Sequence, residues 1–588
     1  MSLRTVPADA VALWKTPLGK LMAAALVLRL AGLVWGLPAS DGWDDDGVAP
    51  RDFLVGLGDT YAPGHHYIYP PLHLLILAVV LAPVWITTLL HAPSWAPDAV
   101  VHTFIAVGPM TAMAVLARLV STAMSLGILW NAAKIGETLG GSPRAGFWTA
   151  AACALDAVFT YYSQTTNLDV PYLFWGTLSL RWLVAAVARR EPRLLRRVAW
   201  LAACGVATKD QAYALFLVGV PATLAIWLAL DRTARALAGQ IARDLAVGAA
   251  IALILLLAVD GALVNPHGFM DRIRTLLGPA SQNHANYPAT WAGREALLRD
   301  IVLAFRSFYP WLFVPFIALG IAVALRTPDG PEGPIRGPDP ARRAASLAPL
   351  AFALSFTLAF NLTARRTEAR FLLPQSLYCG IYAGIAFAWI AKRAPLGLRA
   401  LACAVVGGAV APALFGCVAV DVAMLRDPRY DAEAWMRDHI RPGDTLEVYG
   451  NDVHLPRLPQ DAVLTRVDST PLKGRNPLPG LREVEDSFSN VEARKPRFIL
   501  VSEFWAYKYL ALPEQLTAKG RSVSGEQMAI DRDEEARDYF RRLRDGLTAY
   551  RFAHISTWTS RIWPRVDIHA SLTRDVWIFE RNDTPGSS

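Results

Sequence analysis

Long apolar segments separated by short polar loops run through the first 424 residues, and this pattern constrains the fold more than any other feature. The segments cover about 21–37, 104–130, 146–162, 170–187, 198–230, 244–264, 301–325, 344–361, 371–391 and 400–424. A membrane helix needs about 20 mostly apolar residues, and the 198–230 segment suits a compressed hairpin of two crossings. The sequence therefore predicts a polytopic α-helical membrane protein with about eleven spans.

The composition agrees with a membrane protein and excludes several other classes. Hydrophobic residues make up 53% of the chain and charged residues only 18%. The net charge of +8 does not call for nucleic acid as a partner, because many Arg and Lys residues fall in short loops where they set orientation in a membrane. All five Cys residues lie in apolar segments, which argues against a disulfide framework or a Cys-based zinc site.

The basic loops predict the orientation in the membrane. They are the N-terminus, 131–145, 188–197, 231–243, 326–343 and 392–399, and we expect them to be cytoplasmic. The 91–103 linker carries no Lys or Arg, so we expect the preceding 72–90 segment to lie in the membrane interface or re-enter it. Counting spans then places 38–103, Asp169, Lys209 and the C-terminus on the non-cytoplasmic side.

The residues after 424 are more polar and predict a second domain. The 427–450 stretch has the periodicity of a helix, a Pro-Gly turn and a strand, and "PRFILVSEFW" and "VWIFERN" predict two further strands. We therefore expect a membrane domain over 1–424, with an external loop at 38–103 whose catalytic role is implied by the resemblance described below, and a soluble non-cytoplasmic α/β domain over 425–588.

Five motifs occur in an order that is typical of one enzyme family. They are the acidic cluster Asp44, Asp45 and Asp46, then "YPPL" at 69–72, "YYSQTTNLDVP" at 161–171, Thr208-Lys209 and "RFLLP" at 370–374. In this order the chain resembles the lipid-carrier-dependent glycosyltransferases of the C superfold, the group that contains protein O-mannosyltransferases and the lipid A aminoarabinose transferase.

Three positions depart from the family pattern. The family usually has Asp-Glu followed by an aromatic residue, whereas Gly47 follows this triplet and Pro50 stands four residues after Asp46. The downstream "RDFLVGL" segment favours Asp46 as the counterpart of the family's first acid. Tyr69 stands where the aminoarabinose branch often has Lys, and Gln164 stands where the family has Arg.

The resemblance implies transfer of a hexose or pentose from a polyprenyl-phosphate carrier to a glycan, lipid or protein, at the plasma (inner) membrane of a bacterium. A carboxylate would accept the proton of the acceptor hydroxyl, and cations would stabilise the leaving phosphate. The expected catalytic residues are Asp46, Asp45 and Asp169, and a divalent metal (Mg or Mn) would be held by Asp46 and Asp169. The residues expected to bind substrate are Lys209, Arg365, Arg366, Arg370, Tyr69, His66, Arg272 and Arg274.

Each of these residues also has a structural interpretation. The acidic triplet would be a solvated helix start, and Asp169 a cap of the fourth span. Lys209 would extend its ammonium to the membrane surface, and the arginines of 361–370 would contact lipid headgroups. Buried Arg29 and Arg118 would partner acids or carbonyls within the bundle. At the level of the whole chain, the alternatives are a ligase or polymerase of lipid-linked glycans and, less favoured, a flippase or transporter.

Overall fold

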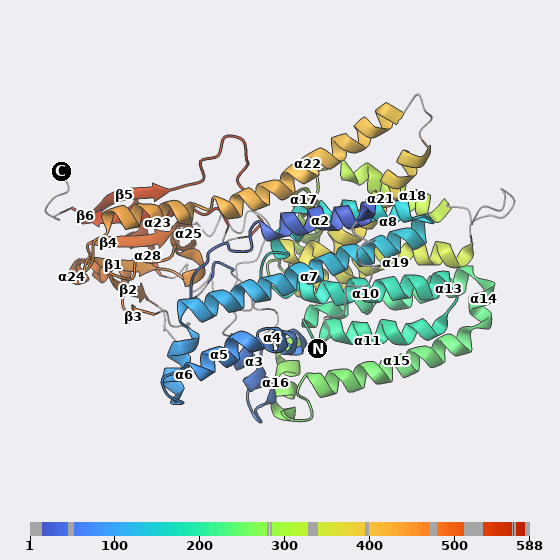
Figure 1. Cartoon of the computed structure of the whole chain (residues 1–588), viewed down its shortest axis with the longest axis horizontal. Coiled ribbons are helices and arrows are strands. Elements are labelled where there is room, and N and C mark those ends of the chain that lie inside the picture. The colour runs from blue at the N-terminus through green and yellow to red at the C-terminus, as the bar shows by residue number, and fades with distance from the viewer. Residues whose placement is uncertain are drawn as a thin grey trace.

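The computed structural model describes residues 15–40, 42–44, 52–278, 282, 285–326, 339–393, 399–469, 479–510, 533–566, 568–569 and 572–582. Two of the expected catalytic residues, Asp45 and Asp46, lie outside the described residues, whereas Asp44 lies within them. The described chain forms a long bundle of helices with a six-stranded sheet at one end (Figure 1).

Helices account for most of the first 425 residues. They are α2 (Pro17–Leu30), α3 (Asp52–Tyr61), α4 (Leu72–Val80), α5 (Ala82–Leu90), α6 (Pro97–Phe104), α7 (Val107–Gly140), α8 (Pro143–Ala154), α9 (Ala157–Tyr162), α10 (Asp169–Ala188), α11 (Leu195–Val206), α12 (Tyr213–Phe216), α13 (Gly219–Leu230), α14 (Arg232–Ala236), α15 (Ala238–Val259), α16 (Pro266–Leu277), α17 (Trp291–Phe308), α18 (Phe313–Arg326), α19 (Pro340–Phe356), α20 (Leu362–Ala364), α21 (Leu373–Arg393) and α22 (Arg399–Leu425). Short 3-10 turns η1 (Pro192–Leu194), η2 (Asp210–Ala212) and η5 (Ala369–Leu372) and the π-helical turn η4 (Thr357–Asn361) connect some of them.

Several of these helices have the dimensions of membrane spans, and the chain is an integral membrane protein. Within the described ranges, seven helices are long and apolar enough to cross a membrane, or nine if each of two bent pairs is one span. Every segment expected to cross forms helix. Three are shorter than a full span in one piece: α2 has 14 residues, α11 has 12, and a break at Leu155–Asp156 separates α8 from α9.

The segment expected to cross over 301–325 is sharply bent. Helices α17 and α18 meet at an angle of 100°. The cause is Pro310, because a residue that precedes proline is pushed out of the helical region, and Tyr309 has the extended φ of -137° and ψ of 150°. Helices α4 and α5, which form the 72–90 segment, are bent by 63° at Leu81. That shape suits a segment lying in the membrane interface.

The C-terminal residues form an α/β unit, as the sequence predicts. Its helices are α23 (Pro428–His439), α24 (Val491–Arg494), α25 (Glu503–Leu510) and α28 (Glu534–Arg544), with turns η7 (Asp452–His454) and η8 (Phe488–Asn490). Its strands are β1 (Thr445–Tyr449), β2 (Val463–Asp468), β3 (Leu481–Glu485), β4 (Phe498–Ser502), β5 (Tyr550–Ser556) and β6 (Val576–Arg581). The strand order is β3-β2-β1-β4-β6-β5, parallel from β3 to β4 and antiparallel beyond.

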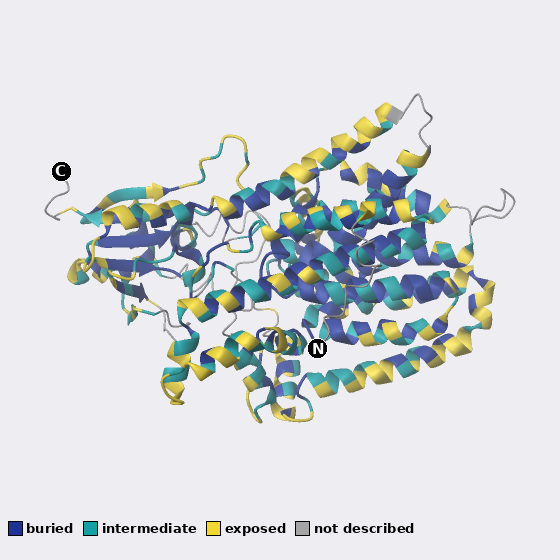
Figure 2. Cartoon of the chain, in the orientation of Figure 1, coloured by how far each residue is buried: buried dark blue, intermediate teal, exposed yellow. Residues whose placement is uncertain are grey.

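Both faces of this sheet are covered. Helix α23 packs Ala432 and Met436 on one face, and α25 and α28 pack Tyr509 and Phe540 on the other. Figure 2 shows the central strands β1 and β4 as mostly buried, and it shows the centre of the helical bundle as a second buried core. Because a mostly parallel sheet is apolar on both faces, it needs this double cover, and the short C-terminal unit has a core of its own.

Candidate functional site

The centre of the candidate site is a buried ion pair between Asp169 and Lys209. Asp169 is the first residue of α10, and Lys209 follows the end of α11. The Lys209 ammonium lies 2.8 Å from each carboxylate oxygen of Asp169, and the side chains are 10% and 0% exposed. Lys209 therefore does not extend to the membrane surface. Asp169 is not the helix cap either, because Leu168 holds that position.

Phe371 brings a third motif to this ion pair. Its ring centroid lies 5.8 Å from the Lys209 nitrogen, and the guanidinium carbons of Arg366 and Arg370 lie 4.6 and 4.7 Å from it. Glu368 pairs with both arginines, at 2.6 Å from Arg366 and 2.8 Å from Arg370. Since an aromatic face attracts cations, Phe371 helps hold three positive groups close together.

Asp44 joins the first external loop to the segment before α10. Its Oδ2 accepts hydrogen bonds from the backbone N–H of Thr166 and, at 2.8 Å, from the Thr166 hydroxyl. Thr166 precedes Asp169 by three residues. Burial raises the pKa of Asp44, whereas nearby Arg118 and the Thr166 hydrogen bonds act in the opposite direction. Asp44 is therefore not the solvated residue of an ordinary loop.

The loop that carries Asp44 is fixed from the membrane side by Arg118 of α7. The Arg118 Nη1 donates to the carbonyls of Leu33 and Trp35, both at 2.8 Å. This agrees with the expectation that a buried arginine in the bundle satisfies carbonyls.

The C-terminal unit holds the same loop from the other side. Trp35 donates its indole N–H to Asp427 at 3.2 Å, and Arg457 donates to the Leu37 carbonyl at 2.8 Å. The Arg429 guanidinium lies 4.0 Å from the ring centroid of Trp43. Residues 35–40 and 42–44 are therefore held between α7 and the start of the C-terminal unit.

A second ionic cluster lies next to Lys209, where the 198–230 hairpin turns. Arg272 of α16 contacts Asp210 and lies 3.8 Å from Asp260. The Tyr67 hydroxyl donates to the Asp260 carbonyl, and the Arg272 guanidinium lies over the Tyr67 ring at 5.2 Å. Burial raises the pKa of Asp260 to about 7, and the charge of Arg272 opposes this rise. Arg272 is thus engaged by carboxylates, next to Lys209.

The other expected binding residues are spread over the same end of the bundle. Arg365 donates to the Tyr287 carbonyl at 2.7 Å, and its backbone has a φ of 55°. His66 lies 2.9 Å from Asp271, with both side chains about half exposed. Tyr69 and Arg274 are exposed. The structure therefore gathers Lys209, Arg366 and Arg370 closely around Phe371 but leaves Tyr69, His66 and Arg274 at the surface.

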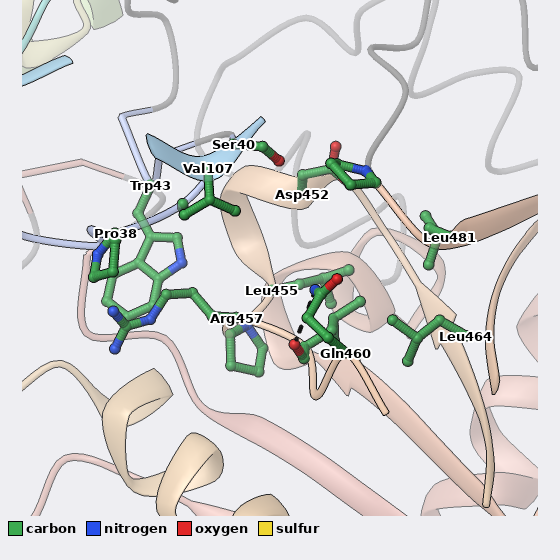
Figure 3. Close-up of a pocket in the computed structure, with 14 residues that line it drawn as sticks. Pro38, Ser40, Trp43, Val107, Asp452, Leu455, Arg457, Gln460, Leu464 and Leu481 are labelled. Atoms are coloured by element: carbon green, nitrogen blue, oxygen red, sulfur yellow. Dashed lines mark hydrogen bonds between the residues drawn. The ribbon is translucent and has the colours of Figure 1, made fainter. Parts of the chain in front are cut away.

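A groove of about 260 Å³ opens between the Asp44 loop and the C-terminal unit (Figure 3). Trp43 and Val107 line one side, and Leu455, Leu464 and Leu481 line the other. Its lining is mostly apolar. Because Trp43 is the neighbour of Asp44, the groove adjoins the segment that carries the acidic cluster.

Sequence reasoning overlooked several partners in the site. Asp44 was placed in the cluster but not among the catalytic residues, and Asp210 and Asp260 were not singled out. Asp210 stands beside Lys209, and Thr166 lies within the "YYSQTTNLDVP" motif, so local signals existed for both.

Of the two expected metal ligands, Asp46 lies outside the described residues, so the metal site stays a prediction. Both oxygens of the other expected ligand, Asp169, accept hydrogen bonds from Lys209. Within the described ranges, no group of three or more His, Cys, Asp or Glu side chains is placed to hold a metal ion.

The fold and the site define a polytopic membrane protein with a sheet-containing C-terminal unit and a buried acid–cation cluster where the two meet. No family profile and no curated protein matches the sequence. Among solved structures, the chain is similar to ArnT from Cupriavidus metallidurans in the apo state, with 15% identity, a TM-score of 0.46 and coverage of 82% of this chain and 93% of that one.

Two further solved structures are similar at the same level. ArnT bound to undecaprenyl phosphate has 14% identity and a TM-score of 0.41, and covers 97% of this chain and 98% of that one. The Archaeoglobus fulgidus oligosaccharyltransferase tethered with an acceptor peptide has 11% identity and a TM-score of 0.46, and covers 97% and 89%. At these scores the similarity carries no functional argument, so the function is argued from the residues.

Proposed function

We propose that this protein is a membrane glycosyltransferase that moves a monosaccharide, a hexose or a pentose, from a polyprenyl-phosphate carrier to a glycan, lipid or protein. The observation that carries this proposal is the meeting of three motifs around the Asp169–Lys209 pair, with Asp44 bound to Thr166 beside it. A carboxylate and several cations at one membrane face are what the reaction requires.

The reaction breaks the bond between the anomeric carbon and a phosphate oxygen of the carrier. The acceptor hydroxyl oxygen bonds to that carbon, its proton passes to a carboxylate, and polyprenyl phosphate leaves with the bonding electrons. We assign the proton acceptor to Asp46, with Asp45 beside it, because both follow Asp44 directly in the chain. Asp44 would keep them near α10 through its hydrogen bonds to Thr166.

The cations would bind the carrier phosphate. Arg366 and Arg370 are about four-fifths or more buried, and both pair with Glu368. Lys209 is balanced by Asp169, so this pair would orient the site rather than add net charge. Arg365, Arg274, Tyr69 and His66 would contact the donor or the acceptor from the rim. Because Asp169 is paired with Lys209, no step is assigned to a divalent metal.

We also propose the domain roles and the orientation. Residues 1–424 would form the catalytic membrane domain, with the loop 38–103 on the non-cytoplasmic side and the N-terminus in the cytoplasm. Residues 425–588 would lie outside, at a bacterial inner membrane. The basic loops at the end of the bundle opposite to the sheet support this orientation.

The direct test uses the purified full-length protein in lipid nanodiscs. It is incubated with polyprenyl-phosphate hexose and pentose, and released polyprenyl phosphate is measured by mass spectrometry. Wild type should release carrier, whereas Asp46→Asn should not; Asp98→Asn, in the exposed helix α6, is the matched control. Absence of cleavage with intact translocation would favour a flippase. Consumption of a polyprenyl-diphosphate glycan alone would favour a ligase or polymerase.

The acceptor and the sugar can be identified in cells. Lipid-linked and surface glycans from strains with and without the gene would be compared by mass spectrometry. The proposal predicts that one polyprenyl-phosphate sugar accumulates in the deletion strain and that one surface product lacks the same sugar.

A further inference from the structure

A groove on the outside of the helical bundle lies between α8, α21 and α22, far from the candidate site. Its volume is about 450 Å³, and apolar or small side chains form most of its lining, among them Trp148, Ala402, Val406 and Val410. Figure 1 shows α22 running along the outside of the bundle past α21 and α8. The groove is therefore on the surface that the surrounding bilayer covers.

One face of the first half of α22 points away from the bundle core, and Figure 2 shows much of this part of the helix as exposed. Leu401 and Val405 are 61% and 47% exposed, and Cys403, in the groove lining, is also exposed. Apolar side chains with this exposure in a membrane-spanning helix contact lipid tails. Acyl chains are therefore the natural occupants of the apolar part of the groove.

Two cations line the same groove. Arg144 is the second residue of α8, and Lys392 lies in the last turn of α21. Both are exposed, and neither makes an ion pair or a side-chain hydrogen bond with another described residue. The nearby carboxylate of Glu137 is already bound by Lys134 at 2.8 Å. Two unbalanced positive charges beside an apolar groove favour an anionic headgroup.

The position of the groove along the bundle identifies the membrane leaflet. The start of α8 and the end of α21, which carry Arg144 and Lys392, lie at the end opposite to the sheet, together with the basic loops 188–197 and 231–243. Basic loops mark the cytoplasmic face, and basic pockets between membrane helices on that side bind anionic lipid headgroups.

We propose that the α8–α21–α22 groove is a binding site for an anionic phospholipid of the cytoplasmic leaflet. Arg144 and Lys392 would hold its phosphate, and the groove between Trp148 and Val406 would hold its acyl chain. A phospholipid is favoured over the polyprenyl carrier because the candidate catalytic residues lie at the other end of the bundle. This inference does not depend on the proposed reaction.

The chain offers a discriminating pair of variants. Arg144→Gln combined with Lys392→Gln removes the two charges of the groove. Arg232→Gln combined with Arg243→Gln removes two exposed charges from the same end of the bundle, outside the groove. If the groove is the site, only the first pair should weaken binding of phosphatidylglycerol.

A third variant tests the apolar part of the groove. Gly407 lines the groove, and a Cβ atom added there would meet no other atom within 4 Å, so Gly407→Leu places a side chain at the groove with open space around its Cβ. Leucine also favours helix over glycine, so α22 should not be weakened. A variant that keeps or raises thermal stability yet binds less phosphatidylglycerol separates lipid binding from a merely structural effect.

The experiment is native mass spectrometry of the full-length protein in detergent, titrated with phosphatidylglycerol, cardiolipin or phosphatidylcholine. Wild type should retain the anionic lipids preferentially. The Arg144/Lys392 double variant should bind them roughly 10- to 30-fold more weakly, as expected for two near-surface cations. Equal retention by this variant and wild type, equal binding of phosphatidylcholine, or displacement by undecaprenyl phosphate at lower concentration would each overturn the proposal.

Discussion

The ammonium of Lys209 lies 2.8 Å from both carboxylate oxygens of Asp169, although the two residues are 40 positions apart in the sequence. Both side chains are withdrawn from solvent. Taking two charges out of water is costly, and their attraction repays the cost only while both partners are present. Loss of either residue should therefore destabilise the protein, and the same pair is the centre of the proposed site.

Removal of one partner should cost more than removal of both. Asp169→Asn leaves a buried ammonium and Lys209→Met leaves a buried carboxylate, so each should destabilise the protein by about 3–5 kcal/mol. The double variant should lose much less than the sum of the two. Thermal unfolding in detergent measures this coupling. The exposed Arg544–Asp545 pair is the control, where each substitution should cost less than about 1 kcal/mol. Additive losses at Asp169 and Lys209 would contradict a coupled pair.

The proposed chemistry predicts a second kind of coupling. Asp46→Asn and Asp169→Asn should each lower turnover by about 100-fold or more while the protein still inserts and purifies as one species. If the two carboxylates act as one unit, the double variant should be little slower than the slower single variant. Release of polyprenyl phosphate is the measurement. Near-normal turnover by both single variants would remove the core of the proposed mechanism.

Asp260 should make stability depend on pH in a defined direction. Its pKa is about 7 in the folded protein and about 3.8 for an unperturbed aspartate. The folded state thus binds the proton more tightly, so the contribution of Asp260 to stability is fully present below about pH 4 and is lost as the pH rises to about 7. The difference in thermal midpoint between Asp260→Asn and wild type should change over this interval and stay constant above it. Glu295→Gln, at an exposed position of α17, is the matched control variant. A constant difference for Asp260→Asn would contradict the raised pKa.

The sequence predicted where the membrane helices lie better than where they break or bend. Apolar segments of span length indicate helices because a backbone in lipid must satisfy its own hydrogen bonds. The 100° bend between α17 and α18 was missed, although Pro310 marked it, because hydropathy averages over a window and does not sense one backbone position. In the C-terminal unit, the 463–468 strand was not predicted because its pairing with β1 and β3 is a tertiary property.

The candidate site was predicted in its residue types but not in its contacts. Motif order drew attention to Asp169, Lys209 and Arg370, yet their meeting around Phe371 depends on how three distant segments pack. Arg272 was expected to bind substrate, which stays a prediction, and its contacts with Asp210 and Asp260 could not be read from the sequence. Charge alone does not tell a ligand-binding arginine from one that neutralises buried carboxylates.

The orientation can be tested by labelling single cysteines in a background without the exposed Cys403. Ser469→Cys in the C-terminal unit and His65→Cys in the first external loop are exposed positions, and both should react with an impermeant maleimide once any outer membrane is made permeable. Arg193→Cys, exposed in the basic 188–197 loop, should react only after the plasma membrane is opened. Labelling of Arg193→Cys alone in intact cells would invert the orientation.

The C-terminal unit should act on turnover through the loop that it holds. The Arg457 guanidinium donates a hydrogen bond to the Leu37 carbonyl at 2.8 Å. The backbone N–H and the Nε–H of Arg457 both donate to the Glu433 carboxylate, at 2.9 and 2.8 Å. Arg457 therefore connects the loop that contains Leu37 to α23. Arg457→Met removes this link, so the loop can move. Turnover falls steeply when catalytic groups on a loop are displaced from the substrate. We expect turnover to fall roughly 10- to 100-fold.

The matched control is Arg437→Met, at an exposed position of α23, the helix that carries Glu433. This variant should leave turnover unchanged. Hydrogen exchange separates a displaced loop from an unfolded C-terminal unit. In Arg457→Met, the backbone amides of 35–44 should exchange faster, whereas those of β1 and β4 should stay protected because the sheet keeps its own core. If turnover and exchange in 35–44 both match wild type, the loop does not depend on Arg457, and the C-terminal unit acts, if at all, by another route.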